Sequence, residues 1–386
     1  KPCPAIIVSA FLAVGCLLSP APLHASDTET IAREAVIIDA TTGRILLSKN
    51  GEMRMPPASM SKLMTVYMVL SRLKEGSLSL EDTFRVSENA WRKGGAKSGS
   101  STMFLDPNSR VTVEELLRGI IVQSGNDACI VIAEGLSGSE PAFAEAMNLK
   151  AKEIGLTGSN FANSTGWPHP DQYMTAQDLA HLALRTITDF PDYYHYYSET
   201  EYTYNGIRQR NRNPLLYKGI GADGLKTGHT KEAGYGLTSS AVQNDRRIIV
   251  VVNGLESKKE RSSESERLMD WAFREFRNYA LLKKGEVVSS AEVWLGTAGR
   301  VPLISSQDLI ITLPRKARKG MKVTVRYEGP IPAPIRVGTP IAELVVSAPN
   351  EEPIIIPLLA GADVGTLGLI GRLGAAIDFL VWGESG

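Results

Sequence analysis

Residues 55–70 read MPPASMSKLMTVYMVL, and this stretch decides how the rest of the chain is interpreted. Its apolar residues recur at helical spacing, so we predict a buried helix over residues 59–73. Ser59 and Lys62 lie three residues apart on one face of the first turn. Unpaired backbone N–H groups and the positive end of the helix dipole favour a developing oxyanion there. The pair is therefore either a helix cap beside a solvated lysine or an activated serine nucleophile.

The same spacing occurs a second time, at Ser71 and Lys74. This second pair lies at the end of the predicted helix, just before Glu75 and Gly76. A lysine there complements the negative end of the dipole and faces water. Position therefore favours the first pair as the one that carries chemistry.

The composition allows two or three globular domains, because 386 residues with 43% hydrophobic content provide an ample core. Lys plus Arg and Asp plus Glu both number 42, which gives zero net charge. Neither this balance nor any run of one sign indicates a nucleic-acid partner.

The first 25 residues have the layout of a secretory signal: one basic residue, an apolar run over residues 5–18, then small residues and prolines. We expect cleavage after Ala25 and an exported protein. The apolar run is too short for a membrane span. An alternative is lipoprotein processing at Cys16, although an apolar, proline-rich stretch continues past it.

Removal of the signal would leave Cys129 as the single cysteine, so we expect no internal disulfide. Cys129 opens the apolar run CIVIA, and we expect it to be a small buried hydrophobe.

Residues 26–282 contain both helical and strand patterns, and we predict that they form the catalytic domain. A hairpin is expected over residues 35–49, and GLKTGHT, GYGLTSSAV and RIIVVVNGL are expected to form successive antiparallel strands. The further helices are predicted at residues 111–122, 128–136, 141–154, 175–185 and 265–279, with Thr175 as an N-cap.

After residue 282 the composition changes. Short strands cut by Gly and Pro indicate a separate small all-β domain over residues 283–358. Residues 359–386 are predicted to be an amphipathic tail that lies in a membrane interface, with Trp382 as an anchor. A packed terminal helix is the alternative, and four glycines between residues 365 and 374 weaken the helical pattern.

Two further motifs are weak alone. Ser124-Gly125-Asn126 breaks two apolar helices, and it is either an ordinary turn or a polar loop that faces a cleft. Lys226-Thr227-Gly228 occurs once, within a predicted strand. A glycine inside a strand often marks the close approach of a ligand or another backbone.

Ser-x-x-Lys on a helix, Ser-x-Asn in an interhelical loop and Lys-Thr-Gly on a strand, in this order, form the signature of penicillin-binding proteins and class A β-lactamases. From about residue 30 the chain resembles the D-alanyl-D-alanine carboxypeptidases among the low-molecular-mass penicillin-binding proteins. The matching pieces are DATTGRILLSKN, PPASMSKLMT, SGNDA, GLKTGHT, AGYGLTSSA, the distal β domain and the tail. The resemblance implies an α/β (α+β) fold of the β-lactamase/transpeptidase type, an antiparallel sheet flanked by helices, and penicillin binding.

The resemblance also implies roles for the motif residues. Ser124 would relay a proton to the leaving D-alanine, and Asn126 would hydrogen-bond the amide of the substrate. Lys226 and Thr227 would face its terminal carboxylate, and Gly228 would be a further substrate-binding residue. The backbone N–H groups of Ser59 and His229 would form the oxyanion hole.

Arg261 follows Lys226 by 35 positions, just past a strand. This placement matches a carboxylate-binding arginine of the family, and a solvated arginine in the charged run SKKERSSESER is the alternative. The histidines show no ligand spacing, so we expect no metal and no cofactor.

A serine hydroxyl needs an adjacent base, and Lys62 can be that base only when it is neutral. Burial and a nearby cation such as Lys226 would lower its pKa in that direction. The predicted activity is removal of the terminal D-alanine from peptidoglycan pentapeptides through a Ser59 acyl-enzyme, which β-lactams would also form. A β-lactamase, a D,D-transpeptidase and a non-catalytic cell-wall binding protein stay open as alternatives.

Overall fold

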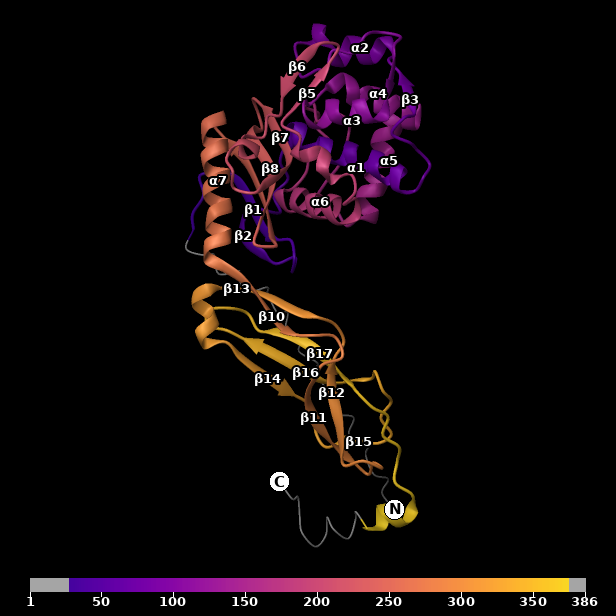
Figure 1. The fold of residues 1–386 in the computed structure, drawn as a ribbon, viewed down its shortest axis with the longest axis vertical. Helices are drawn as coiled ribbons and strands as arrows, with labels where there is room; N and C mark the ends of the chain where they lie inside the picture. Colours follow the sequence, from indigo (N-terminus) through magenta and orange to yellow (C-terminus); the bar gives the residue numbers. More distant parts are fainter. Residues whose placement is uncertain (1–27, 375–386) are drawn as a thin grey trace, which may run out of the picture.

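The computed structural model describes residues 28–374. The predicted signal segment with Cys16, and the end of the tail with Trp382, lie outside these residues. Figure 1 shows two bodies along the long axis, an N-terminal one with helices and strands and a C-terminal one built from strands. The predicted α/β catalytic domain with a C-terminal β domain is confirmed.

The N-terminal body contains an antiparallel five-stranded sheet in the order β2-β1-β9-β8-β7. The predicted hairpin and the three predicted strands all belong to it. The strands are β1 (Glu34–Asp39), β2 (Ile45–Lys49), β7 (Ala222–Thr230), β8 (Gly234–Gln243) and β9 (Arg246–Leu255).

Helices cover both faces of this sheet (Figure 1). The α-helices are α1 (Lys62–Lys74), α2 (Glu88–Gly94), α3 (Val113–Ile121), α4 (Asn126–Ser137), α5 (Glu140–Glu153), α6 (Ala176–Asp189) and α7 (Lys258–Glu275). The 3₁₀ turns are η1 (Ala58–Ser61), η2 (Ala96–Ser98), η3 (Tyr194–Ser198) and η4 (Pro214–Tyr217). Two small antiparallel pairs complete the body: β3 (Thr83–Arg85) with β4 (Arg110–Thr112), which α2 and η2 separate in the sequence, and the hairpin of β5 (Glu201–Tyr204) with β6 (Ile207–Arg210).

Strand β9 shows how one sheet serves two cores. Its side chains alternate between the faces, as the period of two requires. Ile249 and Val251 join the larger core with α1, α3, α4, α5 and α6. Ile248 and Val250 join a second core that α7 closes. A strand buried on both faces needs the continuous apolar run that RIIVVVNGL provides.

Local capping explains most helix boundaries. Thr112 forms a capping box with Glu115 at the start of α3, and the hydroxyl of Thr175 caps α6 as predicted. The prediction for residues 265–279 is wrong at both ends. Helix α7 begins at Lys258, because the hydroxyl of Ser257 accepts from the amide of Glu260, and it ends at Glu275.

The C-terminal body is a β domain that begins earlier than predicted. Strand β10 (Phe276–Leu282) pairs with β13 (Leu309–Pro314), and a six-stranded sheet has the order β14-β16-β17-β12-β11-β15. The remaining elements are β11 (Val287–Trp294), β12 (Arg300–Ser305), η5 (Arg315–Gly320), β14 (Lys322–Arg326), β15 (Ile331–Pro332), β16 (Pro340–Ser347) and β17 (Ile354–Ala360).

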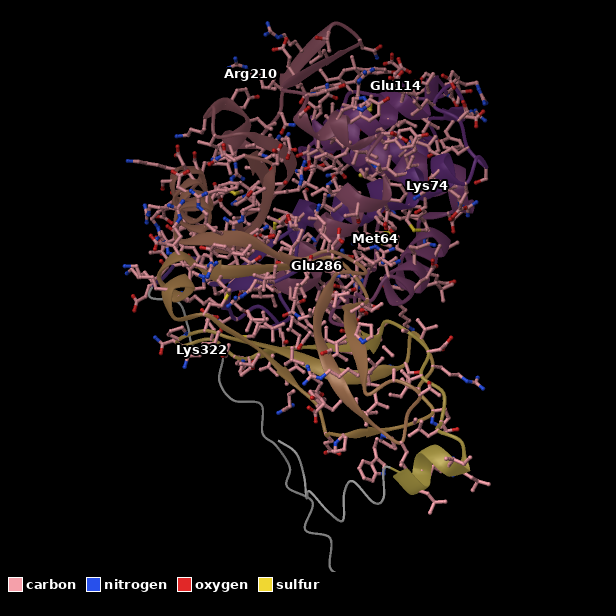
Figure 2. All side chains as sticks on the ribbon, turned by 60° about the horizontal axis from the view of Figure 1, so that its bottom comes forward. Met64, Lys74, Glu114, Arg210, Glu286 and Lys322 are labelled. Carbon is pink, nitrogen blue, oxygen red and sulfur yellow. The ribbon has the colours of Figure 1, made fainter. Side chains whose placement is uncertain are left out.

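The tail begins later than the predicted residue 359. Leu358 and Ala360 of β17 and the buried Val364 belong to the core of the β domain, and the amide of Leu367 donates to the carbonyl of Leu295. A short helical segment over residues 369–374 follows, and Figure 2 shows it standing clear of the β domain. No helix among residues 28–374 is long and apolar enough to cross a membrane.

Candidate active site

Ser59 and Lys62 are in contact. Ser59 lies in the turn η1, and Lys62 is the first residue of α1, so the predicted helical start at Ser59 is a 3₁₀ turn. The Nζ atom of Lys62 lies 2.8 Å from the Oγ atom of Ser59. Ala58, just before the serine, has a φ of 48°, a conformation that costs free energy and is common at functional sites.

Lys62 is fully buried, and its surroundings raise the fraction of neutral amine. Its Nζ also donates to the carbonyl oxygen of Thr165 at 2.5 Å. Burial lowers the pKa of Lys62 to about 8, the charge of Arg212 lowers it further, and Cys129 and Asp127 act in the opposite direction. One N–H held by a carbonyl leaves the lone pair of the neutral amine free to accept the proton of Ser59.

The cation beside Lys62 is not the one expected from the sequence. Burial and the charges of Lys62 and Arg212 hold the pKa of Lys226 well below its usual range. For Lys62, burial is the largest cause of the lowered pKa, and the charge that lowers it further is that of Arg212. Arg212 belongs to no motif and has no periodic signal, and sequence reasoning missed it.

The Ser124-Gly125-Asn126 loop lies between α3 and α4. Ser124 has a φ of 59°, and its buried hydroxyl has no hydrogen-bond partner in the described part of the chain. The side-chain nitrogen of Asn126 donates to the Oγ of Ser100 at 2.9 Å, while its buried oxygen has no partner there. Buried polar atoms are normally paired, so these two are available to a ligand.

Asp127 anchors that loop. Its carboxylate accepts from the hydroxyl of Thr102 at 2.6 Å and from the amides of Met103 and Leu105 at 3.0 and 3.1 Å. The segment with Ser100 is thereby tied to the start of α4.

Strand β7 carries the third motif next to the nucleophile turn. Lys226 and Thr227 are buried. A Cβ atom added at Gly228 would lie 2.9 Å from the carbonyl oxygen of Pro57 and 3.0 Å from the Cγ of Met60. Glycine therefore permits the close approach of strand and turn that the sequence suggested.

Arg261 is buried on α7, so it is not the solvated arginine of the alternative reading. It lies over the ring of Tyr235 at 5.7 Å, and that ring stacks on His229 at 3.9 Å. Burial lowers the pKa of Arg261 to about 10. Its Nε has no partner among residues 28–374, which leaves a buried guanidinium available to an anion.

Arg212 connects the parts of the site. Its guanidinium donates to the hydroxyl of Ser101, and its carbonyl accepts from Arg261 at 3.5 Å. The carbonyl of Ser101 in turn accepts from the amide of Asn126 at 2.8 Å. The basic side chains of Lys62, Lys226, Arg212 and Arg261 thus share one region with the Ser59 hydroxyl. This arrangement can bind a carboxylate beside a nucleophile.

Cys129 is buried, as predicted, and burial raises the pKa of its thiol to about 12. It is therefore an inert packing residue. Among residues 28–374 no three His, Cys, Asp or Glu side chains are grouped to hold a metal ion.

Residues 21–257 match the family described as D-alanyl-D-alanine carboxypeptidase, peptidase S11. The chain belongs to this family. Residues 276–366 match the C-terminal domain of penicillin-binding protein 5, which agrees with the start of β10.

The chain is similar to DacA, a D-alanyl-D-alanine carboxypeptidase of Haemophilus influenzae, with 39% identity over 89% of this chain and 87% of that protein. The structure resembles that of penicillin-binding protein 5 from Haemophilus influenzae, with a TM-score of 0.80, 37% identity, and coverage of 88% of this chain and 99% of that one. Penicillin-binding protein D2 from Listeria monocytogenes in its ampicillin-bound form has a TM-score of 0.56, 27% identity, and covers 64% of this chain and 100% of its own.

Proposed function

We propose that this chain is a serine D-alanyl-D-alanine carboxypeptidase that removes the terminal D-alanine from peptidoglycan pentapeptides. The observation that carries the proposal is the contact of 2.8 Å between the Ser59 hydroxyl and the buried amine of Lys62, whose pKa is lowered to about 8. Family membership supports the same activity.

The first half of the reaction forms the acyl-enzyme. The neutral amine of Lys62 accepts the proton of Ser59 as the Oγ atom attacks the carbonyl carbon of the penultimate D-alanine. The backbone N–H groups of Ser59 and His229 stabilise the oxyanion. The C–N bond then breaks, the proton taken up by Lys62 passes through Ser124 to the leaving nitrogen, and free D-alanine departs.

The site holds the leaving residue by its carboxylate. Lys226, Thr227 and Arg261 face that group, and Asn126 hydrogen-bonds the peptide amide. The unpaired Nε of Arg261 and the unpaired oxygen of Asn126 support these two roles. In the second half, water attacks the ester carbonyl and releases the tetrapeptide and the Ser59 hydroxyl.

β-Lactams acylate the same serine in this account, because their strained amide and carboxylate imitate the terminal dipeptide. The resemblance to a penicillin-binding protein with bound ampicillin supports this assignment.

Mass spectrometry of the purified protein with a pentapeptide ending in D-Ala-D-Ala tests the activity. We expect loss of one alanine from the peptide and, at short times, an adduct on Ser59. A crosslinked product formed with an amine acceptor would indicate a transpeptidase instead. An unchanged peptide would indicate a binding protein.

We also propose that the exported enzyme rests on the periplasmic face of the inner membrane through its C-terminal tail, with no span. Leu369, Ile370 and Leu373 support this, because they are 82%, 89% and 64% exposed. The β domain would hold the catalytic domain away from the membrane. Truncation after Leu367 spares the core of the β domain and should release the protein from vesicles. Val337→Asp, also at an exposed apolar residue, should not.

A further inference from the structure

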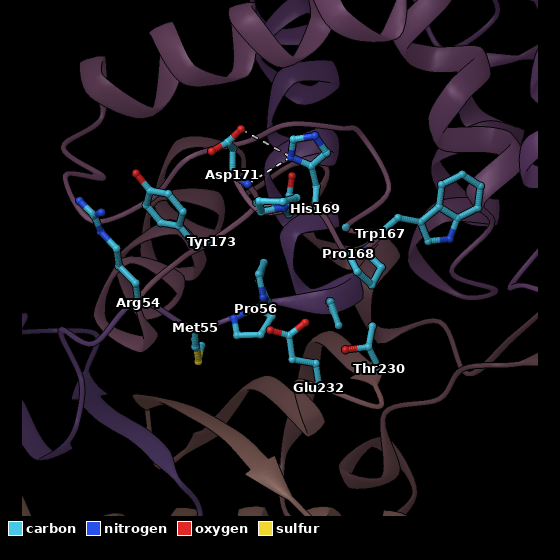
Figure 3. Close-up of a pocket in the computed structure, with 15 residues that line it drawn as sticks. Arg54, Met55, Pro56, Trp167, Pro168, His169, Asp171, Tyr173, Thr230 and Glu232 are labelled. Carbon is cyan, nitrogen blue, oxygen red and sulfur yellow. Dashed lines mark hydrogen bonds and ion pairs between the residues drawn. The ribbon is translucent and has the colours of Figure 1, made fainter.

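A cavity of about 710 Å³ opens beside the nucleophile turn, and the mechanism above does not use it. Its walls come from the segment before Ser59, from residues 166–173, from Thr230 at the end of β7, and from Glu232 just beyond it. Figure 3 shows Arg54 and Tyr173 at one side, Trp167 at the other, and Glu232 opposite Asp171. The volume lies within the range of about 300–1,000 Å³ that small-molecule sites occupy.

Hydrogen bonds hold the walls in place. The backbones of Met55 and Met174 exchange two hydrogen bonds of 2.8 and 3.0 Å, and those of Asn160 and Tyr173 exchange two of 2.8 and 3.1 Å. The side-chain oxygen of Gln172 accepts from the amides of residues 162 and 163 at 2.7 and 3.2 Å. The cavity is therefore formed before any ligand arrives.

The position of the cavity selects the part of the substrate that can enter it. Pro57 and Ala58 line it directly before the nucleophile, whereas Ser124, Thr227 and Arg261 do not line it. In the proposed complex the terminal carboxylate binds at Thr227 and Arg261 and the reacting carbonyl lies at Ser59, so the leaving D-alanine occupies that side of the site. The part of the substrate that can enter the cavity is therefore the peptide that precedes the reacting carbonyl.

The charges in the walls indicate what those residues should carry. Arg54 lies over the ring of Tyr173 at 4.5 Å and has no ion pair within the described residues. Glu232 likewise has none there. Asp171 lies 3.8 Å from the Nδ1 atom of His169, a contact that is an ion pair only when this histidine is protonated. The walls thus offer the cation Arg54 and the carboxylate Glu232, neither of which has a charged partner within the described residues.

The side-chain nitrogen of Gln172 is a further group in the walls that can bind a ligand. The side chain of Gln172 is 4% exposed, and its Nε2 has no partner among residues 28–374. Because two backbone amides fix its oxygen, this nitrogen keeps its orientation and can donate to a ligand oxygen.

We propose that this cavity, which we call the acyl-side pocket (Arg54–Ala58, residues 166–173, Thr230 and Glu232), binds the third residue of the stem peptide. It selects a side chain that ends in both an ammonium and a carboxylate. Arg54 binds the carboxylate, and Glu232 binds the ammonium. The inference rests on the proposed function and extends it to substrate selection.

Three pentapeptides that differ only in the third side chain test the proposal. One side chain ends in an ammonium and a carboxylate, one is lysine and one is norleucine. For the wild type we expect kcat/KM to fall in that order. Arg54→Gln should lower the ratio between the first two peptides about tenfold, and Glu232→Gln should lower the ratio between lysine and norleucine about threefold.

Matched controls remove a charge of the same sign elsewhere. Arg336→Gln and Glu75→Gln alter exposed residues outside the acyl-side pocket and should leave both ratios as they are. Labelling with fluorescent penicillin, which has no third residue, reports whether each variant retains a folded serine site.

The outcomes are distinguishable. Equal kcat/KM values for the three peptides would overturn the proposed selection, and so would ratios that neither pocket variant changes. If penicillin still labels the protein in that case, the proposed function stands. Loss of both labelling and cleavage in the wild type overturns the proposed function and this inference together.

Discussion

Helix α1 and the turn before it carry the pattern Ser-x-x-Lys at both ends, and the two copies have different surroundings. Lys62 is buried and contacts Ser59 at 2.8 Å. At the other end, Ser71 donates to the carbonyl of Tyr67 at 2.9 Å, and Lys74 donates to the carbonyl of Asp189 at the surface. Residue type and spacing are the same, so the environment alone separates a reactive pair from a structural one.

Two features of the first site produce this difference. The approach of β7, which Gly228 permits, and the loop at Thr165 remove Lys62 from water. The 3₁₀ turn then places the Ser59 hydroxyl against the desolvated amine. At the second site the serine hydroxyl is bonded within its own helix, and nothing desolvates the lysine.

The largest expected effect comes from removing each hydroxyl in turn. Ser59→Ala should abolish labelling by fluorescent penicillin and lower carboxypeptidase activity by at least about 10⁴-fold, because the hydroxyl that forms the acyl-enzyme is removed. Ser71→Ala should leave labelling within about twofold of the wild type. Labelling that survives Ser59→Ala, measured on a denaturing gel, would end the assignment.

Replacing each lysine sharpens the comparison through stability. The pKa of Lys62 is about 8 in the folded protein, against 10.5 in the unfolded chain. Between these two pH values the unfolded chain binds more protons, so the free energy of unfolding rises with pH there. Below pH 8 the buried lysine lowers the free energy of unfolding by about 3 kcal/mol. Lys62→Met removes that cost but leaves the Thr165 carbonyl unpaired, which costs about 1–3 kcal/mol.

We therefore expect Lys62→Met to lower activity about 10³-fold and yet to raise the free energy of unfolding at pH 7 by about 1 kcal/mol. Lys74→Met should change it by less than about 0.5 kcal/mol. Urea unfolding of both variants measures this. A Lys62→Met variant that is less stable than the wild type would show that burial of the Lys62 amine does not destabilise the folded protein.

The smallest effect concerns Arg212. Its charge lowers the pKa of Lys62, so Arg212→Gln should raise that pKa and reduce the neutral fraction at pH 7. Acylation by penicillin should fall about two- to fivefold at pH 7 and recover by pH 9. Arg210→Gln, at an exposed arginine two residues away, is the control, and the two pH profiles should differ. Identical pH profiles would show that Arg212 does not lower the pKa of Lys62.

Position along a helix was enough to choose between the two Ser-x-x-Lys copies, and strand periodicity was enough to predict the central sheet. Hydrophobic periodicity did not predict that Arg261 is buried on a helix. Its charged neighbours in SKKERSSESER mask the start of α7 at Lys258, and a buried arginine leaves no apolar signal.

Arg212 and Thr165 escaped prediction for a related reason. Both act through tertiary placement, Arg212 through its charge and Thr165 through a backbone carbonyl that any residue type would provide. The start of the β domain at Phe276 was missed because apolar residues at helical spacing continue past the end of α7.

The most direct test of a neutral base beside Ser59 is an NMR titration of the Lys62 ε-carbon, with the signal assigned by its loss in Lys62→Met. We predict a midpoint near pH 8 in the folded enzyme. A midpoint at the ordinary lysine value of about 10.4 would contradict the account, because the neutral fraction of the amine near pH 7 would then be about one in 2,500 instead of about one in ten.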